Sequence, residues 1–470
     1  MLAFKQLSWS AFSSIGGAVL DIVRIAILAR FLAPEDFGSF SIALVVLGFC
    51  QLFSEGGVAN ALVSKKTVNA NQAGYILNFS ILVSVVVSVV VIMLTPIIAN
   101  FYQLPVLTQI IPLIVVSIPI SSVSRIFQAM LQRNFEIKTI AKAIIFGKIF
   151  GLLVAVIAIN MSLGIFTLAY STIAAVVFTA LILFKAAIKY VEFQYTIKWV
   201  VIKPILSFSI YQLGEFLLNF FAKNFDVLLI TKLLGAESSG VYVVSKNLLV
   251  RIGDLIVTTF NQYFHPLLAH LQHNKTMLTE NYLCFFRSVS LSVMLAYVLI
   301  ALNHEFIIQI MLGDKYHNAS ELFIIMAVWL SLRYCTAPVA TLWLTRQKPQ
   351  LGLYWNILVA ITIPTAVYLG HNNGLHAVLI NLTLAQVLFL LFSLLVTFHL
   401  TWQLFSVVAQ QIKWLATGVL LVLPFYLLVE FIHLPFYYLM MISIILVAVT
   451  SVYVWTNKAI FLGVENQKCI

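Results

Sequence analysis

Charged and polar side chains recur inside long apolar stretches of this chain, at spacings that place them on single helix faces. Ser10, Ser14, Gly17, Asp21 and Arg24 follow one another at intervals of three or four residues, which is the repeat of one face of an α-helix. A guanidinium group binds phosphate in a bidentate manner, an ammonium group binds it as a point charge, and a carboxylate within a membrane can carry a proton or a cation. This face could therefore bind an anion, a coupling ion, or both.

Three more stretches carry a polar face of this kind. Their residues at helical spacing are Gln212, Glu215, Asn219, Lys223 and Asp226; Asn247, Arg251, Asp254, Thr258 and Asn261; and Ser117, Ser121, Ser124 and Gln128. Polar groups exposed to hydrocarbon would lack hydrogen-bond partners, so such faces must point at one another or at water. Together they predict an internal polar seam.

Bases outnumber acids in these apolar stretches. The bases are Arg24, Arg125, Lys142, Lys148, Lys223, Lys246, Arg251 and Arg333, and the acids are Asp21, Glu215, Asp226 and Asp254. An unpaired base near the bilayer centre costs about 2.5 to 3.5 kcal/mol, so an excess of four costs on the order of 10 kcal/mol, less where a base such as Lys142 lies near a helix end. We therefore predict a water-filled cavity with a positive field, which would attract an anionic substrate.

All of these bases except Lys142 are our candidates for substrate contact, and the four acids are our candidates for a gate or for ion coupling. The best ligand candidates have no acid at helical spacing: Arg125, Lys148, Lys246 and Arg333. Three pairs stand three residues apart and could equally be salt bridges that hold helices together: Asp21/Arg24, Lys223/Asp226 and Arg251/Asp254. Both interpretations stay open.

The composition identifies the elements that carry these residues as membrane helices. The chain has 470 residues, of which 62% are hydrophobic and 9% charged, and its mean hydropathy is +1.04. A water-soluble surface cannot be built from so few polar groups. Stretches long enough to cross about 30 Å of hydrocarbon predict fourteen helices, at 9–32, 37–55, 75–98, 107–130, 139–160, 163–185, 205–232, 239–263, 283–303, 317–343, 352–370, 375–400, 413–432 and 436–456.

The basic residues of the loops predict the orientation. Most lie on the side of both termini, where cytoplasmic loops carry Lys and Arg, so both termini are expected in the cytoplasm. The net charge of +11 then reflects insertion topology and contact with anionic lipid headgroups, and no nucleic-acid partner is expected.

A segment near residue 30 recurs 202 positions later, as ARFLAPEDFGSF and then TKLLGAESSGVY. At the same offset Asp21 corresponds to Lys223 and Arg24 to Asp226, so a charged pair recurs with its signs exchanged. Asp21 could thus meet Lys223, and Arg24 could meet Asp226, across a gate. An even number of helices per copy makes the repeats parallel, as in transporters built of two bundles.

We therefore expect an all-α polytopic membrane protein with two parallel six-helix bundles related by pseudo-twofold symmetry, followed by two further helices. The predicted parts are an N-terminal bundle at 1–185, a cytoplasmic linker at 186–204, a C-terminal bundle at 205–400 and the two additional helices with a cytoplasmic tail at 401–470.

Catalytic and metal-binding motifs are not found in the sequence. It contains no nucleotide-binding loop, no nucleophile elbow and no HExxH. His265, His270 and His273 do not have the spacing of a zinc site, and the four cysteines stand apart. We expect no enzyme activity, no metal and no cofactor.

Four segments resemble one known family in order and spacing. The longest is WSAFSSIGGAVLDIVRIAILARFLAPEDFGSFSIALVVLGFCQLFSEGGVANALVSKK at 9–66. The others are FQAMLQRNFEIKTI at 127–140, LLITKLLGAESSGVYVVSKNL at 228–248 and MLGDKYHNASELFIIMAVWLSLRYCTAPVATLWLTRQKP at 311–349. They are similar to the polysaccharide transporter family, the Wzx-type flippases of the multidrug/oligosaccharidyl-lipid/polysaccharide exporter superfamily.

This resemblance implies a multi-pass flippase of the bacterial inner membrane. Such proteins move undecaprenyl-pyrophosphate-linked oligosaccharide repeat units, for O-antigen, capsule or exopolysaccharide, to the outer leaflet by alternating access. The implied partners are this lipid-linked oligosaccharide, membrane lipids, a coupling H⁺ or Na⁺, and the polysaccharide polymerase machinery. Two alternatives remain, an ion-coupled multidrug exporter with a neutral or acidic cavity, and a membrane-embedded polymerase or ligase that uses an outer-loop acid such as Asp314.

Overall fold

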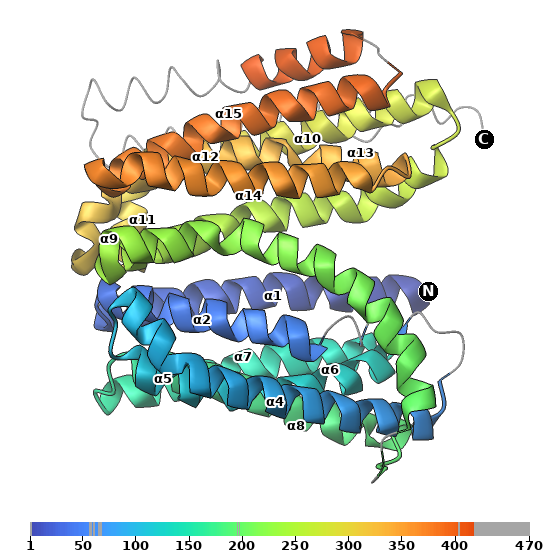
Figure 1. Ribbon diagram of the computed structural model, residues 1–470. Helices are drawn as coiled ribbons and strands as arrows, with labels where there is room; N and C mark the ends of the chain where they lie inside the picture. The colour runs from blue at the N-terminus through green and yellow to red at the C-terminus, as the bar shows by residue number, and fades with distance from the viewer. Residues whose placement is uncertain are drawn as a thin grey trace. The chain divides into compact units, whose positions relative to one another are not determined.

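A computed structural model of the chain describes residues 2–55, 59, 62–63, 68–194, 196, 198–402 and 405–417. All the regular structure formed by these residues is helical (Figure 1). The α-helices are α1 (Leu2–Phe31), α2 (Pro34–Glu55), α4 (Ala70–Tyr102), α5 (Leu107–Val115), α6 (Ser117–Arg133), α7 (Ile137–Asn160), α8 (Phe166–Ala187), α9 (Trp199–His270), α10 (Lys275–Leu302), α11 (His304–Met311), α12 (Ser320–Cys335), α13 (Ala337–Thr345), α14 (Gln350–Gly370) and α15 (Gly374–Leu400).

Ten helical stretches within the described residues are long and apolar enough to cross a membrane. Two of them, 216–270 and 350–400, contain 55 and 51 residues, which at 1.5 Å per residue is more than twice the thickness of the hydrocarbon core. Each covers two of the predicted spans, so the first twelve predictions have a helical counterpart. The all-helical, multi-span prediction is confirmed. The last two predicted spans lie outside the described residues, apart from 413–417, and the total of fourteen stays a prediction.

Glycines interrupt both of the longest stretches. Gly235 breaks α9 with φ 86° and ψ 173°, and Gly374 separates α14 from α15 with φ 83°. These values lie where only glycine is unstrained. Within α9 the Tyr242 hydroxyl donates to Asp226 Oδ2 at 2.5 Å, although a straight helix would hold two residues so spaced about 24 Å apart. The chain therefore folds back at Gly235 (Figure 1).

The chain forms two compact units, residues 1–244 and 245–470. The first unit thus contains α1 to α8 and α9 up to residue 244, nine residues past the break, and the second contains the rest of α9 and the helices after it. The predicted division into bundles at the 186–204 linker stays a prediction.

Small residues bring α7 and α8 into close contact in the first unit. Ala143, Gly147, Gly151 and Ala155 recur every fourth position of α7 and are all buried. A Cβ atom on Gly151 would lie 2.7 Å from the Ser171 carbonyl oxygen of α8. Such small-residue faces let membrane helices approach through their backbones.

The second unit is built around α12, which packs against α10 and α15. A further helical segment at 405–417 is bound to these helices. Its Gln411 Nε2 donates to the Tyr282 hydroxyl of α10 at 3.0 Å, and that hydroxyl lies 3.0 Å from Thr397 Oγ1 of α15. All three side chains are buried, so this contact is a hydrogen-bonded polar cluster inside an apolar unit.

Candidate substrate-binding and gating residues

Arg24 of α1 is held by hydroxyl groups of α8. Its Nη2 donates to Ser171 Oγ at 2.8 Å and to Thr172 Oγ1 at 2.7 Å, with the Leu168 carbonyl oxygen at 3.4 Å. Both hydroxyls donate their own hydrogens to Leu168, which leaves their lone pairs free to accept from the guanidinium. Neutral oxygens of α8 thus accept the hydrogen bonds of this guanidinium nitrogen.

Asp21, one turn earlier on α1, forms a salt bridge with Lys148 of α7. The Nζ atom of Lys148 lies 2.8 Å from Asp21 Oδ2 and donates to the Gly17 carbonyl at 2.9 Å. A Cβ on Gly17 would lie 3.1 Å from this Nζ, so the glycine leaves room for the ammonium. Lys148 has no acid at helical spacing on its own helix, and its acidic partner comes from the neighbouring helix α1.

Asp21, Arg24 and Lys148 therefore form one cluster that joins α1 to α7 and α8. The salt bridge is partly accessible, with side-chain exposures of 31% for Lys148 and 18% for Asp21. A pair so placed can serve as a helix-to-helix contact and can also meet a ligand that enters from water. The two interpretations predict different effects of exchanging the two charges.

Asp226 is a buried acid in the first limb of α9, with only 4% of its surface exposed. Its Oδ1 accepts from the Val227 amide at 2.8 Å, and its Oδ2 accepts from Tyr242. Lys223, one turn earlier, is exposed. The predicted contacts of Asp21 with Lys223 and of Arg24 with Asp226 stay predictions.

A tyrosine pair supports Asp254 in the second unit. The Tyr334 hydroxyl lies 2.8 Å from Asp254 Oδ1 and 2.9 Å from the Val250 carbonyl oxygen. The ring of Tyr334 stacks on that of Tyr297 at 6.2 Å. A Cβ on Gly253 would lie 2.1 Å from the Tyr334 ring, so the bare backbone of α9 forms the surface on which this ring packs.

Replacing Tyr334 with Phe should keep the ring packing and remove the donor to Asp254. Because hydrogen bonds within membrane proteins are worth about 0.6 kcal/mol on average and up to about 1.7 kcal/mol, we expect a loss of stability in this range. Unfolding of the purified variant in detergent, with the matched change Tyr297→Phe as a second measurement, checks the value. A loss well above this range for Tyr334→Phe would show that the contact of the hydroxyl with the Val250 carbonyl oxygen also contributes to stability.

The remaining candidates lie apart from these clusters. Arg125 on α6 and Arg251 on α9 are exposed, whereas Lys246 and Arg333 are half-buried. Glu215 lies in α9, and its side chain is outside the described part of the structure. The structure thus brings together Asp21, Arg24 and Lys148, and leaves the roles of the other candidates as predictions.

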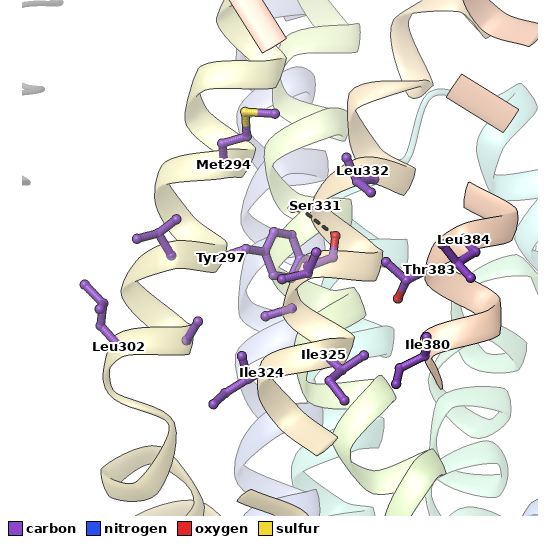
Figure 2. A pocket seen from close by; sticks show the side chains of 14 residues that line it. Met294, Tyr297, Leu302, Ile324, Ile325, Ser331, Leu332, Ile380, Thr383 and Leu384 are labelled. Carbon is purple, nitrogen blue, oxygen red and sulfur yellow. Dashed lines mark hydrogen bonds between the residues drawn. The ribbon is translucent and has the colours of Figure 1, made fainter. Parts of the chain in front are cut away.

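An apolar pocket opens in the second unit, between α10, α12 and α15 (Figure 2). Its volume is about 480 Å³, and its walls include Met294, Tyr297, Ile325 and Leu384. Ser331 is one of the few polar residues in the lining, and its hydroxyl donates to the Val328 carbonyl at 2.8 Å. The pocket therefore offers a mainly apolar surface, which suits hydrocarbon.

Sequence reasoning missed the neutral groups that hold the charged ones. Ser171, Thr172, Tyr242 and Tyr334 each contact a candidate residue, but none belongs to a charged motif. A usable signal existed for the first two, since adjacent hydroxyl residues in an apolar helix indicate a polar partner. Among the described residues, no group of three or more His, Cys, Asp or Glu could hold a metal ion.

Residues 27–321 match the family model described as "Polysaccharide biosynthesis protein", a stretch that makes up more than half of the chain. The chain belongs to this family. The resemblance found in the sequence to polysaccharide transporters is thereby confirmed, and it extends from the C-terminal end of α1 into α12.

Several curated proteins are similar to this chain over most of their length. An uncharacterized membrane protein in the cps region of Klebsiella pneumoniae is 24% identical over 81% of this chain and 79% of its own length. The teichuronic acid biosynthesis protein TuaB of Bacillus subtilis is 22% identical over 78% and 76%. The lipopolysaccharide biosynthesis protein WzxC of Escherichia coli is 21% identical over 81% and 77%.

Solved structures share the fold of this family member. The lipid II flippase MurJ in an inward closed conformation superposes with a TM-score of 0.72 at 13% identity, over 96% of this chain and 99% of its own. An inward-facing multidrug resistance MATE transporter of the MOP superfamily gives a TM-score of 0.62 at 14% identity, over 80% and 93%. At such identities the likeness establishes the fold alone.

Proposed function

We propose that this protein is a flippase that moves undecaprenyl-pyrophosphate-linked oligosaccharide repeat units from the cytoplasmic to the outer leaflet of the bacterial inner membrane. Membership of the polysaccharide biosynthesis family supports this assignment, as does the name of WzxC, a lipopolysaccharide biosynthesis protein. The fold shared with a lipid II flippase suits a transporter and not an enzyme.

The observation that carries the proposal is the exposure of bases within membrane-spanning helices. Arg125, Lys223 and Arg251 are exposed on α6 and α9, and a base that faces lipid tails is costly. These side chains are instead expected to face water, where their positive field would attract the pyrophosphate and any acidic sugars. The prenyl tail would stay in the lipid phase, because it has no polar group to desolvate.

Alternating access completes the proposal. With both termini in the cytoplasm, the cationic cavity would open first to the cytoplasm and then to the outer side, and a proton or sodium gradient would drive the exchange. Asp21, Glu215, Asp226 and Asp254 are the candidate coupling carboxylates. Of the three acids whose side chains the structure describes, Asp226 is the most buried.

Deletion of the gene should make the lipid-linked repeat accumulate on the cytoplasmic leaflet and remove the surface polysaccharide. In the complemented strain, Arg125→Ala and Arg251→Ala should each reduce flipping roughly ten- to a hundredfold, since a hydrogen bond to a charged group is worth about 1.5 to 3 kcal/mol. The measurement is the amount of lipid-linked repeat accessible on each leaflet, at matched amounts of protein in the membrane.

Lys142→Ala is the matched control for these changes. Lys142 is also an exposed base, but it lies five residues from the start of α7 and can reach the headgroups, so its loss should leave flipping unchanged. Normal surface polysaccharide in the deletion strain, without a second flippase, would refute the proposal. Lost drug resistance with an unchanged lipid-linked pool would favour a multidrug exporter instead.

A further inference from the structure

The two copies of the repeated segment contact each other in the structure. We call residues 30–38 the first corner and residues 232–240 the second corner; both belong to the first unit. The first corner joins α1 to α2, and the second contains the break of α9 at Gly235. The sequence shows that they are copies, and the structure shows that they are also neighbours.

Their contact is reciprocal at the level of single atoms. A Cβ on Gly38 would lie 1.8 Å from the Ala236 carbonyl oxygen, and a Cβ on Gly240 would lie 1.7 Å from the Pro34 carbonyl oxygen. Gly240 is the copy of Gly38, and Ala236 is the copy of Pro34, at the same offset of 202. Exchanging the two corners therefore maps this contact onto itself, as in a twofold interface.

Only glycine permits this approach. Each glycine meets the carbonyl that stands four residues before the other glycine, and the hydrogen that replaces its side chain points at the carbonyl oxygen, as in a Cα–H···O contact. Any larger residue at Gly38 or Gly240 would strike backbone, which cannot rotate away as a side chain can. The two helices must then separate.

Polar contacts support the second corner, and the residues beside both corner glycines are buried. Lys232 of the second corner donates to the Phe101 carbonyl at the end of α4, and its Nζ lies 4.6 Å from the centre of the Phe101 ring. Thr231 and Ser239 form a hydrogen bond of 2.6 Å across the break of α9. Ser39 and Ser239, which adjoin the two corner glycines, have exposures of only 2% and 0%. The contact is therefore closed to water.

We propose that the two corners form a self-complementary clasp that closes the extracytoplasmic side of the protein, and that outward opening separates Gly38 from Gly240. The clasp rests on the proposed alternating-access function and on the predicted topology, which places the end of α1 outside. Because the two corners are copies of one segment, the surface of one corner is complementary to the surface of the other. The Cα–H···O contacts between its glycines and carbonyl groups are individually weak, which suits a contact that must open in every cycle.

Thiol labelling on intact cells tests the clasp. A protein with its native cysteines replaced carries the single change Ser39→Cys, and the probe is a membrane-impermeant maleimide. We expect slow labelling with Gly240 present and severalfold faster labelling when Gly240→Ala is added. Gly214→Ala is the matched control, because Gly214 lies in the same helix and a Cβ there meets nothing within 4 Å; it should leave the labelling slow. Fast labelling with native Gly240, or equal rates for both alanine variants, would overturn the clasp.

A second measurement guards against simple misfolding of the Gly240→Ala variant. Glu35 and Glu237 are exposed copies of each other beside the contact, so Glu35→Cys/Glu237→Cys can be joined by a cleavable thiol cross-linker with both glycines intact. Flipping should stop on cross-linking and return on cleavage. Continued flipping by the cross-linked protein would refute the clasp. Gated labelling by a protein that proves not to flip the lipid-linked repeat would instead refute the proposed substrate and leave the clasp standing.

Discussion

Asp21→Asn should destabilise the protein and abolish transport, and exchanging the two charges in Asp21→Lys/Lys148→Asp should restore the stability. The single change leaves Arg24 and Lys148 as neighbouring bases without the carboxylate that Lys148 contacts at 2.8 Å. An uncompensated base costs about 2.5 to 3.5 kcal/mol near the bilayer centre, and the partial exposure of this pair lowers that figure. We therefore expect a loss of roughly 1 to 3 kcal/mol in the free energy of unfolding, measured on protein in detergent or nanodiscs.

The exchange variant separates a structural role of the pair from a role in transport. If the salt bridge only joins α1 to α7, the exchanged pair restores both stability and flipping. If Lys148 contacts the substrate, the exchanged pair restores stability alone, because the base now projects from α1. Lys142→Asp provides the control, since it changes a base of α7 near the helix end. Native stability of Asp21→Asn would show that this salt bridge contributes nothing to folding.

Most of the fold could be predicted from hydropathy. The predicted span 139–160 corresponds to α7 at Ile137–Asn160, and 375–400 corresponds to α15 at Gly374–Leu400. Membrane helices are predictable in this way because their length is set by the bilayer and their backbone groups must be satisfied within the helix. The ends are less certain, since α1 and α4 extend beyond the apolar core of their spans.

The partners of the charged residues were not predictable in the same way. Spacing along one helix places Asp21 beside Arg24, but it does not show that Lys148 of α7 binds Asp21 or that the hydroxyls of α8 bind Arg24. These contacts depend on which helices pack together and at what rotation, and a hydropathy pattern contains neither quantity. The repeat was visible in the sequence, whereas the contact of Gly38 with Ala236 required the structure.

Gly151→Ala should damage the packing of α7 on α8 and the Arg24 site together. The added Cβ would lie 2.7 Å from the Ser171 carbonyl oxygen and 2.8 Å from the Ala175 Cβ. Overpacking of this kind costs about 1 to 3 kcal/mol, which should outweigh the gain of about 1 kcal/mol from the higher helix propensity of alanine. Gly16→Ala on α1 is the control, because its Cβ meets only the Ile145 side chain, at 3.7 Å, and it should be neutral or stabilising.

The effect on transport should exceed the effect on stability. Ser171 links the two, because its carbonyl faces Gly151 and its hydroxyl accepts from Arg24 at 2.8 Å. When α8 is forced away, the hydroxyl moves with it and the guanidinium loses its position. Adding Ala175→Gly to Gly151→Ala removes one of the two close contacts and should recover part of both properties. Ser171→Ala deletes the hydroxyl and spares the packing, so it should impair transport with little loss of stability. If Ser171→Ala leaves flipping intact while Gly151→Ala abolishes it, the small residues of α7 serve folding alone and the position of Arg24 does not limit transport.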